Sequence, residues 1–442
     1  MRFVKDPEGL MREAIATHGN VFSMNLGGNH FYYLNAGGVS KQHLEEFWKK
    51  TNLRKSAVDT LSLQLFLPNA YESVGRSLHV QMLKSTFNAT LDSQSVKMAR
   101  IFPKVLQQVL AASSNNIVSD PKNLAYDMIA NASCECFLGP ELVSPAMIDY
   151  FKTLFDSLNE PGFRMFLPSW TFKYLYPFLP YRKFHAQIGA LVNDTLEERF
   201  ATYKNDPALL PDDGISHIVR LSRDRDEVLN MVMLLVLASM ITTASALHNA
   251  LYDLANHPLC AAHIREEMQR VGVDTETGGF TRKQFAEMPY LDAFVRESLL
   301  YSAPVVVTSR AVTVDFPTET GTVIPAGATV LVLGTEAHTL LHQDGKPVFA
   351  PERWIPSTAS ATQKYCTTTG PEFVLFGGGA FKCPGRFFST LEIKSSLCVI
   401  LGGFDIGFVD GKRHLEKEFN MANKIPAKDK DGKQVPLVFS PI

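Results

Sequence analysis

The longest apolar pattern in the chain predicts one central helix, from about Asp224 to Asn256. At a rise of about 1.5 Å per residue it would be about 50 Å long, enough to cross a large domain. Its middle, residues 231–246, is apolar on nearly every side, which is typical of a helix that is buried or crosses a membrane. Several polar residues interrupt this run: Asn230, Ser239, Thr242, Thr243 and Ser245. We therefore predict a buried core helix.

Elsewhere the pattern predicts helices over most of the chain and strands in two short regions. Near the start, a helix at 9–18 precedes strands at 21–26 and 31–34. Residues 76–222 follow a helical period that is broken at prolines and glycines. Residues 305–335 alternate and turn at Pro325, which indicates a small sheet. The predicted fold class is mainly α with a small β-rich region.

Composition narrows the classes of protein. The 442 residues are 45% hydrophobic and 20% charged, which is ordinary for a large globular protein. A net charge of −2 gives no electrostatic footprint for nucleic acid. Six scattered cysteines are too few for a disulfide scaffold and fit a reducing compartment. Cys134 and Cys136 lack the second ligand pair of a zinc site, so we place them in a helix.

The stretch with the clearest chemistry is FGGGAFKCPGR at residues 376–386. Its glycines permit backbone angles that other residues rarely adopt, and a helix is predicted to begin just after Cys383. Free N–H groups and the helix dipole favour a thiolate there, and a thiolate can ligate iron. The alternative is a structural cysteine that follows a glycine-rich turn.

The pattern F-x-x-G-x-x-x-C-x-G resembles the haem-binding signature of the cytochrome P450 family. The resemblance covers residues 6–442 and is greatest to the sterol 7-alpha-hydroxylase and prostacyclin synthase branch and to fungal relatives. It implies a single catalytic domain over residues 1–442, a helical prism with haem b between the central helix and the cysteine loop. Cys383 would ligate the iron, Phe376 would shield the sulfur, and Gly379 and Gly385 would be the glycines that the backbone demands.

Other positions match the family only in part. Arg310 matches a propionate-binding arginine, although a surface arginine at a strand end is the alternative. Phe381 stands where the family usually has an arginine that pairs with a haem propionate. At a separate site, the family's Trp-x-x-x-Arg propionate clamp, Arg76 or His79 could serve as a substitute. The family pair Glu-x-x-Arg keeps Glu297 but has Leu300 in place of the arginine. We predict that Arg353, with help from backbone groups, satisfies this structural Glu297, because an unpaired buried carboxylate is costly.

The central helix also departs from the family. Its oxygen-activation motif aligns with residues 238–243, where Ile241 replaces the acid that organises proton-delivering water. Thr242 keeps a hydroxyl for catalysis, with Ser239 beside it, or else it merely bonds back to the carbonyl four residues earlier. The resemblance implies that the substrate contacts Ala238 and Ile241 on this helix. It would also contact the three consecutive valines Val305, Val306 and Val307, which follow the helix of Glu297.

Three functions follow from the resemblance. The first is a monooxygenase fed by an NADPH-dependent flavoprotein reductase, acting on a lipophilic terpenoid, sterol or polyketide of secondary metabolism. The second is an isomerase or dehydratase that rearranges an already oxygenated substrate without electrons. The third is a haem-binding protein without catalysis.

The resemblance also implies partners and a location. A reductase would dock on a basic face formed by Lys382, Arg386, Lys394 and Lys84. Residues 54–75 would roof the substrate cavity, or form an ordinary surface loop, and the aromatic segment 163–181 would cap it. The chain opens without a signal peptide or membrane span, so a truncated monomer is expected. The full-length protein would lie on the cytosolic face of the endoplasmic reticulum membrane.

Overall fold

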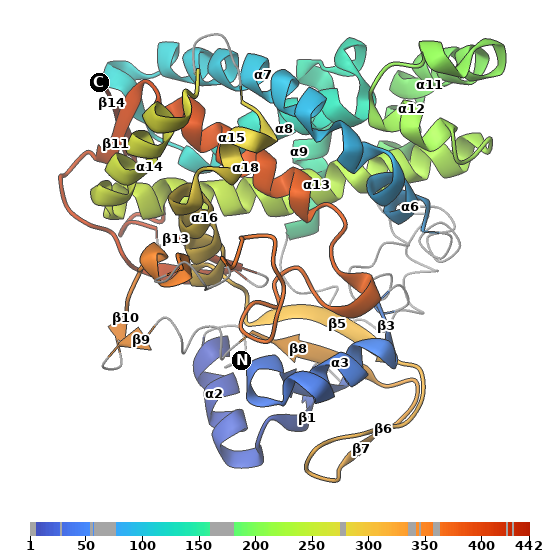
Figure 1. Cartoon of the computed structure of the whole chain (residues 1–442), viewed down its shortest axis with the longest axis vertical. Helices are drawn as coiled ribbons and strands as arrows, with labels where there is room; N and C mark the ends of the chain where they lie inside the picture. Colours follow the sequence, from blue (N-terminus) through green and yellow to red (C-terminus); the bar gives the residue numbers. More distant parts are fainter. Residues whose placement is uncertain are drawn as a thin grey trace.

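The computed structural model describes most of the chain. The described residues are 6–26, 29–53, 56, 77–159, 181–274, 280–334, 342–343, 346–356, 363–420, 423–426 and 428–442. The predicted cavity roof at 54–75 and the aromatic segment at 163–181 lie almost entirely outside them, and Arg76 lies outside as well. In Figure 1 a larger helical part lies above a smaller part that contains the main sheet. The predicted mainly α class is confirmed.

Several helices of the described chain begin at residues with recognisable N-terminal signals. Prolines occupy the first position of five of them, where the missing N–H costs nothing. The helices are α2 (Pro7–His18), α3 (Lys41–Lys49), α6 (Leu78–Ser85), α7 (Leu91–Ala111), α8 (Pro121–Leu138), α9 (Pro145–Asn159), α11 (Tyr181–Asn205), α12 (Gly214–Val219), α13 (Arg225–Asn256), α14 (Pro258–Val271), α15 (Arg282–Ala286), α16 (Pro289–Tyr301) and α18 (Arg386–Leu401).

The main sheet has the order β1-β2-β8-β5-β3, and only the β2–β8 pair is parallel. These strands are β1 (Val21–Leu26), β2 (Asn29–Asn35), β8 (Thr329–Leu333), β5 (Val306–Val312) and β3 (Thr51–Asn52). Gly327 has φ +85° in the turn that leads into β8, a conformation that favours glycine. The predicted sheet at 305–335 is thus present, and it places Arg310 opposite Val330.

Smaller sheets complete the described chain. β11 (Phe404–Phe408), β14 (Leu437–Pro441) and β4 (Ile117–Val118) form a three-stranded sheet. The remaining pairs are β6 (Phe316–Pro317) with β7 (Val323–Ile324), β9 (His342–Gln343) with β10 (Lys346–Pro347), and β12 (Lys417–Asn420) with β13 (Asn423–Pro426).

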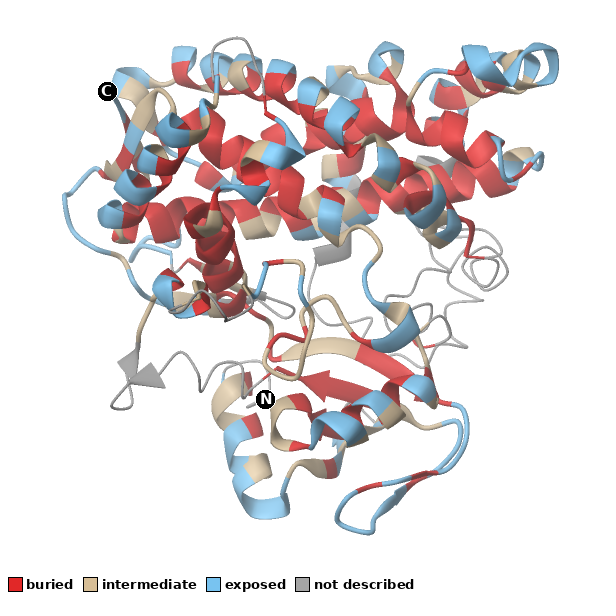
Figure 2. Ribbon diagram, viewed as in Figure 1, coloured by how far each residue is buried: buried red, intermediate tan, exposed pale blue. Residues whose placement is uncertain are grey.

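The predicted central helix is α13, and Asp224 caps it by accepting a hydrogen bond from the Glu227 N–H. By length and hydropathy α13 could cross a bilayer, but 67% of its most apolar stretch is buried inside the protein. It packs against α8, α18 and α16, and Figure 2 shows α16 buried along most of its length. The prediction of a buried core helix is confirmed. Cys134 and Cys136 are buried on its neighbour α8, as predicted.

The second half of α13 binds the C-terminal part of the chain through polar side chains on one face. Asn249 donates to the Lys424 carbonyl, Asp253 pairs with Lys417 at 3.0 Å, and Asn256 bonds both backbone groups of His414. Their spacing of four and three residues puts them on one side of a helix. This row of contacts fixes the β12–β13 hairpin beside the helix that carries Thr242.

We expect the pair of Lys417 and Asp253 to be a sensitive point of the fold. Both side chains are almost fully buried, so Lys417→Met leaves a buried carboxylate without its cation. We predict a loss of about 3 kcal/mol in the free energy of unfolding, measured by urea denaturation. The double variant Lys417→Met/Asp253→Asn should recover most of it, and Lys430→Met on the surface should change little. A full loss that persists in the double variant would refute this role for the charge pair.

Candidate functional site

The cysteine loop lies between the helical part and the main sheet (Figure 1). A short 3₁₀ turn, η9 (Gly379–Phe381), precedes Cys383, and α18 begins at Arg386. The Cys383 N–H donates to the Phe376 carbonyl at 2.8 Å, which closes the loop on itself. Gly377 and Gly379 have φ of +68° and +62°, so the loop requires glycine at both positions.

The prediction that the backbone demands glycine at position 385 is wrong. The φ of Gly385 is −80°, and a Cβ built there would meet only the Cys383 sulfur, at 3.9 Å. The backbone therefore does not demand glycine at this position. What Gly385 provides is open space beside the sulfur and an N–H that donates a hydrogen bond to it.

The loop is also shaped by a residue that the sequence did not single out, Trp48 of α3. A Cβ at Gly378 would lie 2.2 Å from Trp48 Nε1, and a Cβ at Gly379 would lie 2.6 Å from Trp48 Cβ. Both glycines therefore allow the indole to pack directly on the loop backbone. An aromatic residue on an amphipathic helix gives no sequence signal that distinguishes this contact from ordinary core packing.

The Cys383 side chain is accessible to solvent although protein surrounds it on most sides. Burial raises the pKa of the Cys383 thiol, and the N–H of Gly385 and the charge and N–H of Arg386 lower it. The helix start thus favours the thiolate as predicted, but burial outweighs it in the free protein. A bound metal ion reverses this balance, because a coordinating thiol loses its proton.

One face of α13 is also open, in a helix whose other residues are mostly buried. Ala238 and Thr242 are exposed, and Ser239 and Ile241 are half-buried. These positions lie on one side of the helix, so they form one accessible face of it. α13 packs against α18, the helix that starts at the cysteine loop.

The hydroxyl groups on this open face bond to their own helix. Thr242 Oγ1 donates to the Ala238 carbonyl at 2.9 Å, and Ser239 Oγ donates to the Val236 carbonyl at 2.9 Å. The alternative in which Thr242 bonds back to its helix is therefore realised in the structure. Each oxygen keeps lone pairs that can accept a hydrogen bond from water.

Arg310 is fully buried on β5, so the alternative of a surface arginine is wrong. None of its guanidinium nitrogens has a hydrogen-bond partner among the described residues. The group lies over the rings of Trp48, at 4.7 Å, and Phe381, at 5.4 Å. Burial lowers the pKa of Arg310 to about 10, so it stays charged at neutral pH. A buried cation with no ion pair to the described residues needs an anion, and a carboxylate such as a haem propionate fits it.

Glu297 on α16 is fully buried and has the partners that were predicted. Arg353 lies 3.3 Å from one carboxylate oxygen, the Ala350 N–H donates at 2.8 Å, and the Trp354 indole donates at 2.6 Å. The predicted ion pair with backbone help is therefore present. Burial raises the pKa of Glu297 to about 7 in spite of these donors. Leu300 packs in an apolar cluster with Trp354 and Phe373.

The predicted basic docking face is corrected at one residue. Lys394 is buried on α18 and its amino group pairs with Asp292 of α16, so it cannot meet a partner protein. Lys382 and Lys84 are exposed. Arg386 is half-buried and bonds the Cys383 carbonyl at 2.8 Å.

The remaining predicted residues lie as follows. Val305 is buried with Met11 and Leu333, and Val306 packs against the same cluster. Val307 packs against a second cluster, to which the same strands contribute Leu34, Val330 and Val332. His79 is half-buried on α6. The substrate-lining role of the valines and the propionate role of His79 stay predictions.

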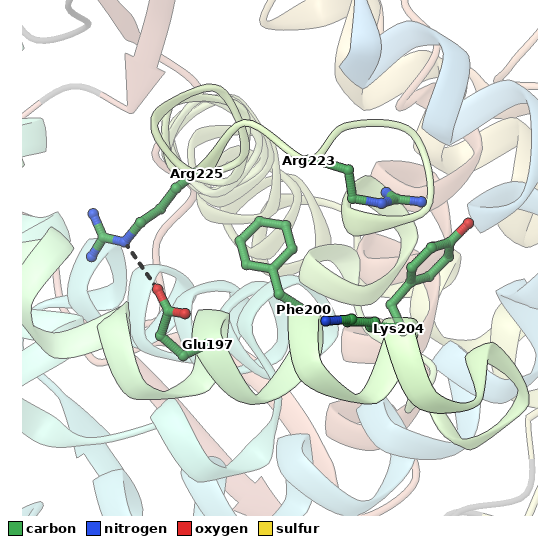
Figure 3. A pocket seen from close by; sticks show the side chains of 6 residues that line it. Glu197, Phe200, Lys204, Arg223 and Arg225 are labelled. Atoms are coloured by element: carbon green, nitrogen blue, oxygen red, sulfur yellow. Dashed lines mark ion pairs between the residues drawn. The ribbon is translucent and has the colours of Figure 1, made fainter.

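A surface pocket of about 480 Å³ lies elsewhere, between α11 and the start of α13 (Figure 3). Arg225 pairs with Glu197 across it at 3.6 Å, and Arg223 stacks on Tyr203. This pocket contains none of the predicted site residues. We therefore place the candidate site at the cysteine loop and the open face of α13, where the residues with suitable chemistry lie. Within the described ranges no group of three or more His, Cys, Asp or Glu side chains could hold a metal ion.

Comparison with known proteins agrees with this geometry. The family model described as Cytochrome P450 matches residues 4–430. A solved structure, retinoic acid bound cyanobacterial CYP120A1, matches with a TM-score of 0.71 and 22% identity, covering 99% of this chain and 95% of that one. This likeness shows the fold.

Similar curated proteins come from fungi. Cytochrome P450 monooxygenase 151 of Postia placenta is 25% identical over 435 residues, which cover 93% of this chain and 86% of the relative. Cytochrome P450 monooxygenase ptmU of Penicillium ochrochloron is 25% identical, covering 93% and 84%. Ent-kaurene oxidase of Gibberella intermedia is 26% identical, covering 66% and 57%. The narrower resemblance to the sterol 7-alpha-hydroxylase branch stays a prediction.

The Glu297 environment predicts a pH dependence of stability. A carboxyl group whose pKa rises from 4.5 to about 7 on folding binds more protons when folded, so stability falls as the pH rises through this window. We expect Glu297→Gln to flatten the slope, by up to about 3 kcal/mol between the two pH limits. Urea denaturation of both proteins from pH 4.5 to 8 measures it. Parallel curves for the two proteins would contradict the assignment.

Proposed function

Because this chain belongs to the cytochrome P450 family, we propose that it is a haem-thiolate monooxygenase that oxidises a lipophilic small molecule. The observation that carries the proposal is one loop that presents an accessible thiol at Cys383 and contacts the guanidinium of Arg310, which has no hydrogen-bond partner in the described part of the chain. A thiolate ligand and a propionate partner on one loop are what a haem requires of the protein. The open face of α13, with Ala238, Ser239, Ile241 and Thr242, would form one side of the substrate cavity.

Each part of the site has a role in holding haem b. Cys383 would ligate the iron, Arg310 would pair with a propionate, and Phe376 would cover the sulfur beside Phe373. Bound haem supplies redox and dioxygen chemistry, tuned by electron donation from the thiolate. Trp48 keeps Arg310 in place by stacking on it and keeps the loop compact by packing on its glycines.

The protein groups on α13 limit how protons arrive. Thr242 and Ser239 already donate to helix carbonyls, so they orient water as acceptors. Either hydroxyl can pass a proton on only after it leaves its carbonyl. Ile241 has no group that transfers protons, so ordered water or a polar group of the substrate would supply them.

This arrangement also supports a second function, an isomerase or dehydratase that rearranges an already oxygenated substrate. Such a reaction needs no proton delivery from α13, which suits an apolar Ile241 and a Thr242 bonded to its own helix. The monooxygenase is favoured because the similar fungal proteins carry that name.

The proposed substrate is a terpenoid, sterol or polyketide, because the open face of α13 carries the apolar side chains of Ala238 and Ile241 beside only two hydroxyl groups, which already bond to the helix. One relative is named for the oxidation of ent-kaurene, which supports a lipophile. We further propose electrons from an NADPH-dependent flavoprotein reductase, a monomer, and attachment to the endoplasmic reticulum membrane in the cell.

The function is tested with purified, haem-loaded protein. The reduced protein with carbon monoxide should show the red-shifted Soret band of thiolate ligation, and Cys383→Ala should lose it. Turnover of lipophiles should require NADPH, reductase and dioxygen, with labelled oxygen in the product. Conversion of a hydroperoxide or endoperoxide without electrons would instead establish the isomerase. Bound haem without either turnover would leave a carrier or sensor.

We predict that replacing Arg310 stabilises the haem-free protein but weakens haem binding in the haem-loaded protein. Arg310→Met removes a buried charge without a partner, so the haem-free protein should gain about 1–3 kcal/mol in its free energy of unfolding. The haem-loaded variant should lose haem faster, because a propionate loses its cation. Urea denaturation and haem transfer to apomyoglobin measure the two effects. A stabilised variant that retains haem as firmly as wild type would remove Arg310 from the cofactor site.

A further inference from the structure

Arg296 is a buried cation that the chemistry described above does not use. It lies on α16 next to Glu297 and is 1% exposed. Its Nη1 donates to the carbonyls of Tyr365, at 2.8 Å, and Thr368, at 2.9 Å. A charged donor shared by two backbone carbonyls fixes the path of residues 365–368.

Two aromatic rings contact the same guanidinium. It lies 4.5 Å from the Trp354 ring and 4.0 Å from the Phe373 ring. Phe373 contacts Phe376, whose carbonyl accepts the Cys383 N–H. Contacts therefore run without a break from Arg296 to the backbone of the cysteine.

The position of Leu300 explains why this arginine matters. Residues 296 and 300 are four apart on α16 and so lie on the same face, one turn from each other. Leu300 packs against Trp354 and Phe373, the two rings that hold the Arg296 guanidinium. One helical turn is about 5.4 Å, which an extended arginine side chain spans. An arginine at either position can therefore reach this aromatic pair.

We propose that Arg296 is a positioning residue that holds the segment 365–376 and thereby fixes the conformation of the cysteine loop. It would take the role of the arginine that the family has at the position of Leu300. The inference rests on the proposed role of Cys383 as haem ligand, but not on which reaction follows. Burial lowers the pKa of Arg296 to about 10, so the group remains a cation at neutral pH. A lysine could not replace it fully, because only a planar guanidinium stacks on two rings and bonds two carbonyls.

The variants that test the proposal are Arg296→Met, Arg296→Lys and the double variant Arg296→Met/Leu300→Arg. Leu300→Arg alone and Arg413→Met, an exposed arginine, serve as controls. One readout is amide hydrogen exchange of residues 365–376 and Cys383 in haem-free protein. The other is the share of thiolate-type Soret absorption in the reduced, carbon monoxide-bound protein.

We expect Arg296→Met to exchange these amides at least about tenfold faster, with the main sheet unchanged, and to lose most of the thiolate-type band. Arg296→Lys should fall between it and wild type. The double variant should restore both readouts, because its arginine reaches the same rings.

Unchanged exchange and spectrum in Arg296→Met would overturn the proposal, and so would a double variant that folds but restores neither. If Arg296→Met does not fold, Arg296→Lys and the double variant decide by the same criteria. If wild type binds no haem, the proposed function fails, while exchange in the haem-free protein still tests Arg296.

Discussion

An accessible thiol held on a tightly closed loop is the constraint on which the rest of this structure depends. The loop presents Cys383 because it closes on the Phe376 carbonyl and turns through two glycines in the left-handed region. Trp48 can pack on the loop only because Gly378 and Gly379 have no Cβ. The glycines lose conformational entropy on folding, and in return the loop packs closely and holds one sulfur atom in place.

Several charged residues that the family pattern led us to expect are missing, and the structure shows which groups replace some of them. Glu297 loses an arginine but keeps Arg353, a backbone N–H and an indole as donors. Phe381 replaces a cation with a ring that packs against Arg310. No other group on α13 replaces the acid that is missing at Ile241. For this reason the isomerase remains the second proposed function.

Most of the fold could be predicted from the sequence, because α13, the strands at 305–335 and the start of α18 depend on local signals of hydrophobic period, capping and turns. The Glu297–Arg353 pair was also predictable, since a buried carboxylate requires a cation. Contacts between distant segments were not. Nothing in the sequence places Trp48 on the glycines, turns Lys394 inward to Asp292, or shows that Gly385 keeps an ordinary backbone angle.

Iron X-ray absorption on the purified, haem-loaded protein tests the central claim most directly. The account predicts one sulfur ligand to iron besides the pyrrole nitrogens in wild type, and its absence in Cys383→Ala. A spectrum without sulfur in wild type, or one that keeps its sulfur after the substitution, would contradict it.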